Sequence, residues 1–216
     1  MKRFLTIITL GLMLTSCGVP KPTYQYKKTA NKPKIQKTIN KNFDIIWNKV
    51  IDYSSKSFFS IDNFEKDSGL ITLNFSGDPV GYIECGEFSY NGFISNMTNV
   101  KNYSGTFQEF AKKYYGANLN GRMNILVKQV NQNETFVRAN TRYVFSFNRP
   151  NPRGSYYARD TQTWTFNGGQ EVSNNLIFGA MDISFAVSEG INITCQSTYK
   201  LEKESFSVDI GSSIFL

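Results

Sequence analysis

Apolar residues recur at helical spacing in the segment 42–59, with charged and amide side chains between them. They are Phe43, Ile46, Trp47, Val50, Ile51 and Phe58. This spacing predicts an amphipathic helix with one buried face. Residues 59–65 and 70–75 alternate instead between apolar and polar positions, on either side of the turn-forming residues 66–69. The sequence therefore predicts a β-hairpin directly after the helix.

The strongest alternation lies in residues 122–130 and 135–147, which flank a turn at 131–134. In the second of these strands, one face carries Val137, Ala139, Thr141, Tyr143, Phe145 and Phe147. The other face carries Arg138, Asn140 and Arg142. Because successive side chains of a strand point to opposite faces, we predict one buried and one solvated face.

A short helix is predicted at residues 107–115. Thr106 and Glu109 match a capping box in front of it, and Gly116 ends the apolar run. The remainder of residues 86–120 is rich in Gly, Asn, Ser and Tyr. We interpret this remainder as a long excursion from the fold.

Further strands are predicted at 80–85, 156–166, 183–187 and 191–197, and residues 199–209 are expected to close the chain as a helix. The order of a helix, many antiparallel strands and a final helix favours an α+β fold. In this fold an antiparallel β-sheet packs against the N-terminal amphipathic helix. A single domain is expected to cover residues 41–216.

The helix and hairpin also carry a recognisable pattern: a helix with a Trp, a short strand, and then Asp-x-Gly-aliphatic. The residues of this pattern are Trp47, Ile61, Asp67, Gly69 and Ile71. Over residues 43–75 it resembles the start of BamC-type (NlpB) lipoprotein domains, which have a helix-grip fold and belong to the outer-membrane barrel-assembly machinery. The resemblance implies a helix-grip-like architecture. The chain departs from that family by having one domain rather than two, and by its excursion at 86–120.

The beginning of the chain has the parts of a secretory signal. Lys2 and Arg3 precede an apolar run from Phe4 to Leu14. This run is too short for a membrane-spanning helix, which needs about 20 apolar residues. We predict a signal peptide at residues 1–16, and the alternative is a buried N-terminal helix.

The tetrapeptide Leu14-Thr15-Ser16-Cys17 resembles the lipobox of bacterial lipoproteins. The resemblance implies lipid attachment at the Cys17 sulfur, cleavage before Cys17, and acylation of the new amine by a chain such as palmitate. Gly18 after the lipidated Cys implies, by the same analogy, the bacterial outer membrane with the chain facing the periplasm. An ordinary signal-peptidase site followed by Cys is the alternative. Placement at the inner membrane or on the cell surface also stays open.

Residues 17–40 contain three Pro and six Lys and no acid, which predicts an extended tether. The formal net charge of +7 originates in the signal and the tether, because residues 44–216 carry 15 basic and 17 acidic groups. The basic pI near 9.2 is therefore no sign of nucleic-acid binding. The tether lysines either lie against anionic lipid headgroups or are simply solvated.

The chain contains no His. A Ser-His-Asp triad, a Cys–His pair and His-ligated zinc or haem are thereby excluded, and we expect no cofactor and no metal site. Cys85 and Cys195 remain once Cys17 carries lipid. In an oxidising periplasm these two are expected to form a disulfide, which would close a loop of about 110 residues. Two unpaired buried thiols are the alternative.

Two charge patterns bear on activity. A cell-wall glycosidase needs two carboxylates about 5 to 9.5 Å apart. The acids considered for it are Glu84, Glu87, Asp160 and Glu171, and no pair among them has a recognisable signature. Arginines also alternate with aromatic residues over 138–159, a pattern that can bind nucleic acid or phosphorylated glycans. Strand periodicity separates the two kinds of side chain onto opposite faces, so a solvated sheet edge is favoured.

These observations favour a lipid-anchored, periplasm-facing envelope lipoprotein that acts as a non-enzymatic binding or assembly domain. Its expected partners are the membrane, through the lipid, and an envelope protein, with lipopolysaccharide or peptidoglycan as further ligands and no nucleic acid. The alternative is a cell-wall-active hydrolase that uses paired carboxylates. A structural lipoprotein without a specific ligand is the third hypothesis.

Overall fold

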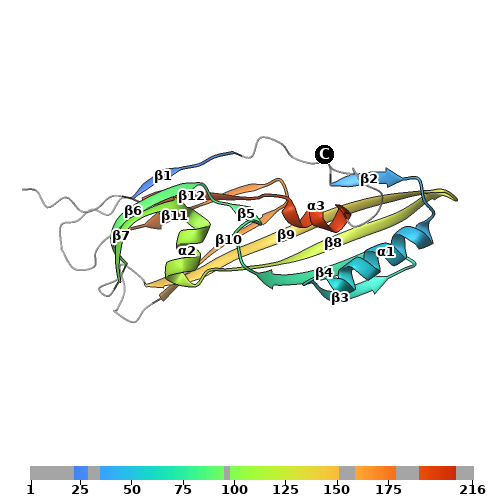
Figure 1. Cartoon of the computed structure of the whole chain (residues 1–216), viewed down its shortest axis with the longest axis horizontal. Helices are drawn as coiled ribbons and strands as arrows, with labels where there is room; N and C mark the ends of the chain where they lie inside the picture. The colour runs from blue at the N-terminus through green and yellow to red at the C-terminus, as the bar shows by residue number, and fades with distance from the viewer. Residues whose placement is uncertain (1–21, 29–34, 95–97, 151–158, 179–189, 208–216) are drawn as a thin grey trace, which may run out of the picture.

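The computed structural model describes residues 22–28, 35–94, 98–150, 159–178 and 190–207. This part of the chain is mostly antiparallel β structure with three helices (Figure 1). None of these helices is long and apolar enough to cross a membrane. The elements in chain order are β1 (Thr23–Gln25), β2 (Gln36–Ile39), α1 (Phe43–Lys56), β3 (Ser60–Glu65), β4 (Leu70–Gly77), β5 (Ile83–Glu84), β6 (Glu87–Ile94), β7 (Thr98–Thr106), α2 (Phe107–Tyr115), β8 (Asn118–Asn131), β9 (Glu134–Pro150), β10 (Arg159–Asn167), β11 (Glu171–Ile177), β12 (Gly190–Ser197) and α3 (Lys200–Ser207).

The largest sheet has the strand order β10-β9-β8-β4-β3, and β2 also pairs with β9. The central strands β8 and β9, of 14 and 17 residues, run along the long axis of the molecule (Figure 1). Their pairing extends from Asn118 opposite Ser146 to Asn131 opposite Glu134. The predicted strand pair is thereby confirmed, and both strands are longer than the sequence pattern indicated.

One face of this sheet forms the core. The residues predicted for the inward face of β9 are all buried: Val137, Ala139, Thr141, Tyr143, Phe145 and Phe147. Trp164 and Phe166 of β10 lie beside them and are buried as well. Arg138, Asn140 and Arg142, on the other face of β9, are exposed. The alternation in the sequence thus predicted the orientation of β9 correctly.

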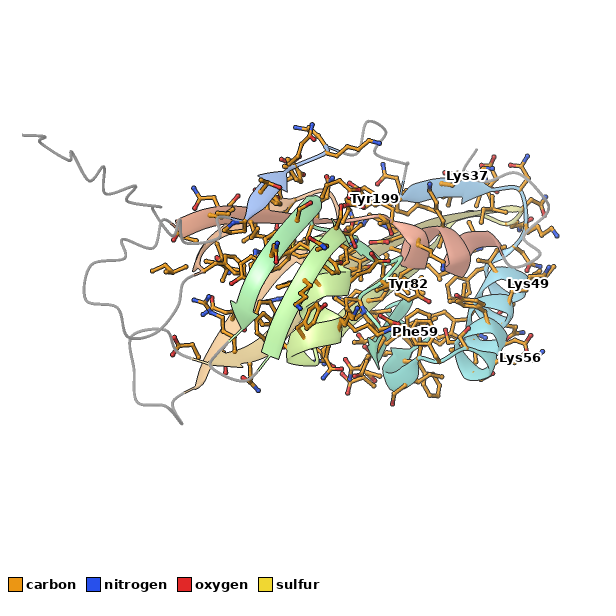
Figure 2. The ribbon with its side chains drawn as sticks, turned by 60° about the vertical axis from the view of Figure 1, so that its left-hand side comes forward. Lys37, Lys49, Lys56, Phe59, Tyr82 and Tyr199 are labelled. Atoms are coloured by element: carbon orange, nitrogen blue, oxygen red, sulfur yellow. A yellow bond between two sulfur atoms is a disulfide. The ribbon has the colours of Figure 1, made fainter. Side chains whose placement is uncertain are left out.

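The helix α1 covers one end of the core face, where it packs against β3, β8 and β9. It occupies most of the segment whose apolar spacing favoured a helix. Asn42 caps it, because its side-chain oxygen accepts a 3.0 Å hydrogen bond from the backbone N–H of Ile45. Figure 2 shows Lys56 on the outer side of this helix, whereas Phe59, three residues after its end, is buried.

The helix α2 lies near the other end of the molecule, against β6, β7 and β9 (Figure 1). Its predicted capping box is present, with reciprocal hydrogen bonds between Thr106 and Glu109. It ends at Gly116, whose φ of 65° lies in the left-handed region that favours glycine. Phe107 of this helix contacts Phe147 and Trp164, so α2 joins the aromatic core of the large sheet.

The interpretation of residues 86–120 as an excursion is corrected by the structure. Apart from α2 and the start of β8, this segment forms the antiparallel hairpin β6–β7, which joins β1 in a second sheet of order β1-β6-β7. Phe88 and Tyr90 of β6 are buried. Gly, Asn and Ser dilute the alternation of these strands, and this composition concealed them in the sequence.

A third sheet has the order β11-β12-β5, with β12 in the centre. Here β5 is a two-residue strand within the predicted 80–85, β12 begins one residue before the predicted 191–197, and β11 was not predicted. The final helix α3 lies within the predicted 199–209. The predicted strand at 183–187 lies outside the described residues.

The segment expected to be a tether contributes two of the described strands. Within residues 17–40, β1 pairs with β6 and β2 pairs with the start of β9. The Tyr24 hydroxyl also bonds the backbone of Thr194 on β12, accepting from its N–H at 2.9 Å and lying 3.2 Å from its carbonyl oxygen. The strands β1 and β2 thus pair with the rest of the fold at two separate places.

Candidate functional site

A polar cavity of about 440 Å³ lies on the exposed face of the large sheet, opposite the core. Three adjacent strands, β8, β9 and β10, provide its walls. The lining residues are Arg122, Asn124, Asn140, Thr141, Arg142 and Asn167. We call this cavity the Arg–Asn groove.

Strand register brings the side chains of the groove together. Arg122 of β8 is directly opposite Arg142 of β9, and Asn124 is opposite Asn140. On the other side of β9, Arg142 is opposite Asn167 of β10. Residues that face each other across neighbouring strands point to the same face of a sheet. Two guanidinium and three amide groups therefore share one small area.

The two arginines differ in how their charge is balanced. Arg122 forms an ion pair with Asp62 of β3, and its Nε donates a 3.4 Å hydrogen bond to the Asn74 side chain of β4. The Arg142 side chain has no hydrogen bond or ion pair with any residue in the described part of the chain. Like charges directly opposite each other destabilise a sheet. Among the described residues, the positive charge of Arg142 in the groove is therefore uncompensated.

The side-chain amides of the groove also make few hydrogen bonds within the described residues. The Asn124 side-chain oxygen accepts a 3.2 Å hydrogen bond from the Thr72 hydroxyl. The side chains of Asn140 and Asn167 make no hydrogen bond within the described residues. Each amide offers two N–H donors and a carbonyl acceptor. The groove thus presents free donors and acceptors beside the cation, a composition suited to a polar ligand.

Only some of the residues that line this groove were predicted from the sequence. The exposed positions of Arg138 and Arg142 were predicted from the alternation of β9 and are confirmed. Arg149 from the same pattern is instead buried on the core face, where its Nη1 donates a 2.6 Å hydrogen bond to the carbonyl of Ile177. Burial lowers the pKa of Arg149. Arg122, Asn124 and Asn167 were not singled out, because their proximity depends on register between strands.

The structure pairs Cys85 and Cys195 as a disulfide, in agreement with the sequence expectation. The bond joins the residue after β5 to β12, and both cysteines are buried. It links positions 110 residues apart in the sequence. Cys17, the predicted lipid-attachment residue, lies outside the described residues.

Two of the acids considered for a hydrolase lie in one row of the third sheet. Gln196 of β12 is opposite Glu171 of β11 on one side and opposite Glu84 of β5 on the other. Glu87 lies on β6, in the second sheet, and Asp160 lies on β10 opposite Arg149. The predicted set of four acids is thus divided among three sheets.

The row formed by Glu171, Gln196 and Glu84 is occupied by contacts with the chain's own residues. Lys28 forms an ion pair of 3.2 Å with Glu171, and the Glu84 side chain accepts a 2.9 Å hydrogen bond from the Gly86 N–H. Burial and the nearby Glu171 charge raise the pKa of Tyr26 to about 12. The segment after β1 therefore contacts this row, through Lys28 at Glu171 and the Lys27 carbonyl at Gln196, while Glu171 stays exposed.

No group of His, Cys, Asp and Glu side chains in the described residues is arranged to hold a metal ion. Comparison with models of protein families, with curated proteins and with solved structures finds no match to the chain.

Proposed function

We propose that the chain is a lipid-anchored, periplasm-facing envelope protein that binds an envelope component through the Arg–Asn groove and catalyses no reaction. The observation that carries this proposal is the lining of the groove. It supplies guanidinium and amide groups, which recognise ligands by hydrogen bonds. Among the described residues that line it there is no carboxylate, thiol or amine to transfer a proton or attack a substrate.

The proposed location depends on the lipobox-like tetrapeptide ending at Cys17 and on the apolar run before it. The disulfide between Cys85 and Cys195 supports the same compartment, because disulfides persist in oxidising environments such as the periplasm. Attached acyl chains contribute about 0.8 kcal/mol per buried methylene, so several chains would anchor the protein durably.

The architecture adds a second, coarser argument. In the structure the helix α1 packs on the face of a long antiparallel sheet, leaving the opposite face of β8 and β9 to solvent. We propose that this arrangement is helix-grip-like, as the local resemblance to BamC-type domains implies. A domain of this kind would act by presenting its open sheet face to a partner in the envelope.

The anchor is tested by intact-mass analysis of the protein from the membrane fraction. We expect a mature chain that begins at Cys17 and carries acyl chains. The Cys17→Ser variant should lose detergent partitioning while its domain still folds, because no core residue is changed. A wild-type chain with an unmodified N-terminus at Cys17 would overturn the proposed localisation.

The binding role is tested by placing a photo-crosslinking residue at Asn140, inside the groove, in cells with an intact envelope. Ser55 on the exposed side of α1 provides the control position. We expect a defined adduct from position 140 and none of the same mass from position 55. Identical adducts from both positions, or no adduct from position 140, would contradict a binding role for the groove.

The hydrolase remains a second candidate because Glu84 and Glu171 share one row of a sheet. Purified peptidoglycan is the substrate for its test. Turnover that disappears in the Glu84→Gln or Glu171→Gln variant would establish the hydrolase and displace the binding proposal. We expect no turnover, because Lys28 forms an ion pair with Glu171 and the Glu84 carboxylate already accepts a hydrogen bond from the Gly86 N–H.

A further inference from the structure

We infer that the Arg–Asn groove binds an acidic saccharide, with the carboxylate or phosphate of the sugar at Arg142 and its hydroxyl groups on the surrounding amides. This inference depends on the proposed function, since it names the ligand of the same groove. It follows from three features: the unbalanced charge, the free amides and the lack of apolar residues among the described residues that line the groove.

The unbalanced charge indicates an anionic group. Arg122 and Arg142 are opposite each other in adjacent strands, yet within the described residues only Arg122 has an acidic partner, Asp62. An anion at Arg142 would remove the repulsion between the two guanidinium groups. A guanidinium holds carboxylate or phosphate through two parallel hydrogen bonds, which fixes the orientation of the ligand as well as adding to affinity.

The amides indicate hydroxyl groups next to that anion. Sugar hydroxyls both donate and accept hydrogen bonds, and so do the side chains of Asn140 and Asn167, which flank Arg142 on the same face. The cavity of about 440 Å³ lies within the usual range for small-molecule sites, about 300 to 1,000 Å³. It is large enough for more than the anionic group alone.

The lining also argues against other ligand classes. Single-stranded nucleic acids stack their bases on aromatic side chains, and no aromatic residue in the described part of the chain lines the groove. Peptide and acyl-chain sites are lined mainly by apolar side chains. Among the described side chains that line this groove, one methyl group is present, that of Thr141, which is buried on the core face.

The experiment titrates the purified mature chain, in detergent micelles, with four probes followed by calorimetry. The probes are glucuronate, glucose 6-phosphate, glucose and inorganic phosphate. We expect glucuronate or glucose 6-phosphate to bind at least about tenfold more tightly than glucose and than phosphate alone. The two acidic sugars distinguish a carboxylate ligand from a phosphate ligand.

Three variants locate the binding. Arg142→Ala should weaken the acidic sugar about tenfold or more, because the charge-assisted contact is lost. Arg138→Ala removes the same charge from the same face of β9, outside the groove, and should change affinity less than about twofold. Asn140→Ala should weaken the sugar but leave phosphate binding unchanged. Thermal unfolding of each variant checks that the fold is retained.

The inference is overturned if neither acidic sugar binds the wild-type chain more tightly than phosphate does. It is also overturned if Arg138→Ala weakens binding as much as Arg142→Ala, since that result would show attraction to general positive charge. These outcomes do not depend on the anchor or on crosslinking in the envelope. Failure of the saccharide inference and failure of the proposed function are thus distinguishable.

Discussion

The Tyr143 hydroxyl donates a 2.6 Å hydrogen bond to Oε2 of Glu202, and this bond ties α3 to β9 beneath the large sheet. Both side chains are buried. Among the described residues, the other carboxylate oxygen, Oε1, has no hydrogen-bond partner, and neither do the hydroxyls of Thr141 and Ser197. Burial raises the pKa of Glu202 above its ordinary value, while the bond from Tyr143 opposes that shift.

This pair predicts a pH dependence of stability. An acid whose pKa is raised in the folded state is protonated more readily there than in the unfolded chain, so stability falls as pH rises from the unfolded pKa, near 4.5, through the folded pKa. Glu202→Gln removes this titration and keeps an acceptor for Tyr143. We expect the variant to be more stable than wild type by about 1 kcal/mol at neutral pH, with the difference shrinking towards pH 4.

Urea unfolding of both proteins between pH 4 and pH 8 measures this difference. The Glu202→Ala variant is the control, since it leaves the Tyr143 hydroxyl buried without its acceptor and should lose about 1 to 3 kcal/mol. A difference between Glu202→Gln and wild type that does not change with pH would show that Glu202 is not the titrating group.

The disulfide predicts a large loss of stability when it is removed. It closes a loop between positions 110 residues apart, and cross-linking so long a loop stabilises a protein by about 4 to 5 kcal/mol on the chain-entropy model. The double variant Cys85→Ala/Cys195→Ala should lose an amount of this order in urea unfolding. If reduction of the wild-type bond left the unfolding midpoint unchanged, the disulfide would have no such role.

The ends of α2 predict two smaller effects. Thr106→Ala removes the capping box and should cost about 1 kcal/mol. Gly116→Ala places a side chain at a φ of 65° and should cost about the same, through backbone strain rather than contact. Thr163→Ala, on the exposed face of β10, is the control and should stay within about 0.5 kcal/mol. Equal losses in all three variants would refute the capping explanation.

Gly121 of β8 predicts an effect of close packing. A Cβ at this position would lie 2.3 Å from the Arg142 carbonyl oxygen and 2.3 Å from the Phe75 ring. Gly121→Ala should therefore destabilise the large sheet by about 1 to 3 kcal/mol. Gly77→Ala, in the neighbouring strand β4, meets nothing within 4 Å and is the matched control. Thermal unfolding of the two variants compares them, and similar losses would argue against the packing account.

The sequence was most informative where apolar and polar positions alternate without interruption. In β9 the pattern alone separated Tyr143 and Phe145 from Arg138 and Arg142, because strand geometry assigns alternate residues to opposite faces. The capping residues of α2 were likewise predicted correctly, since a capping box depends only on residues close together in the sequence. Local hydrogen bonding and periodicity thus gave the orientation of single elements.

The pattern of apolar and polar positions could not predict which residues of neighbouring strands lie opposite each other. The Arg–Asn groove depends on Arg122 of β8 meeting Arg142 of β9, which only strand register decides. The hairpin β6–β7 was missed because its apolar residues are spaced by Gly, Asn and Ser. The strands β1 and β2 are short and polar, and their pairing with distant strands left no periodic signal.

The pairing of β1 with β6 also limits how far the body can stand from the bilayer. If Cys17 carries the proposed lipid, only five residues separate it from Thr23, the first residue of β1. A chain of that length reaches roughly 20 Å even when fully extended. The edge formed by β1 would then sit close to the lipid headgroups, while β2 pairs with the far part of β9 (Figure 1). The end of the body that carries β1 would then always face the membrane, and the short linker would keep the body close to the bilayer.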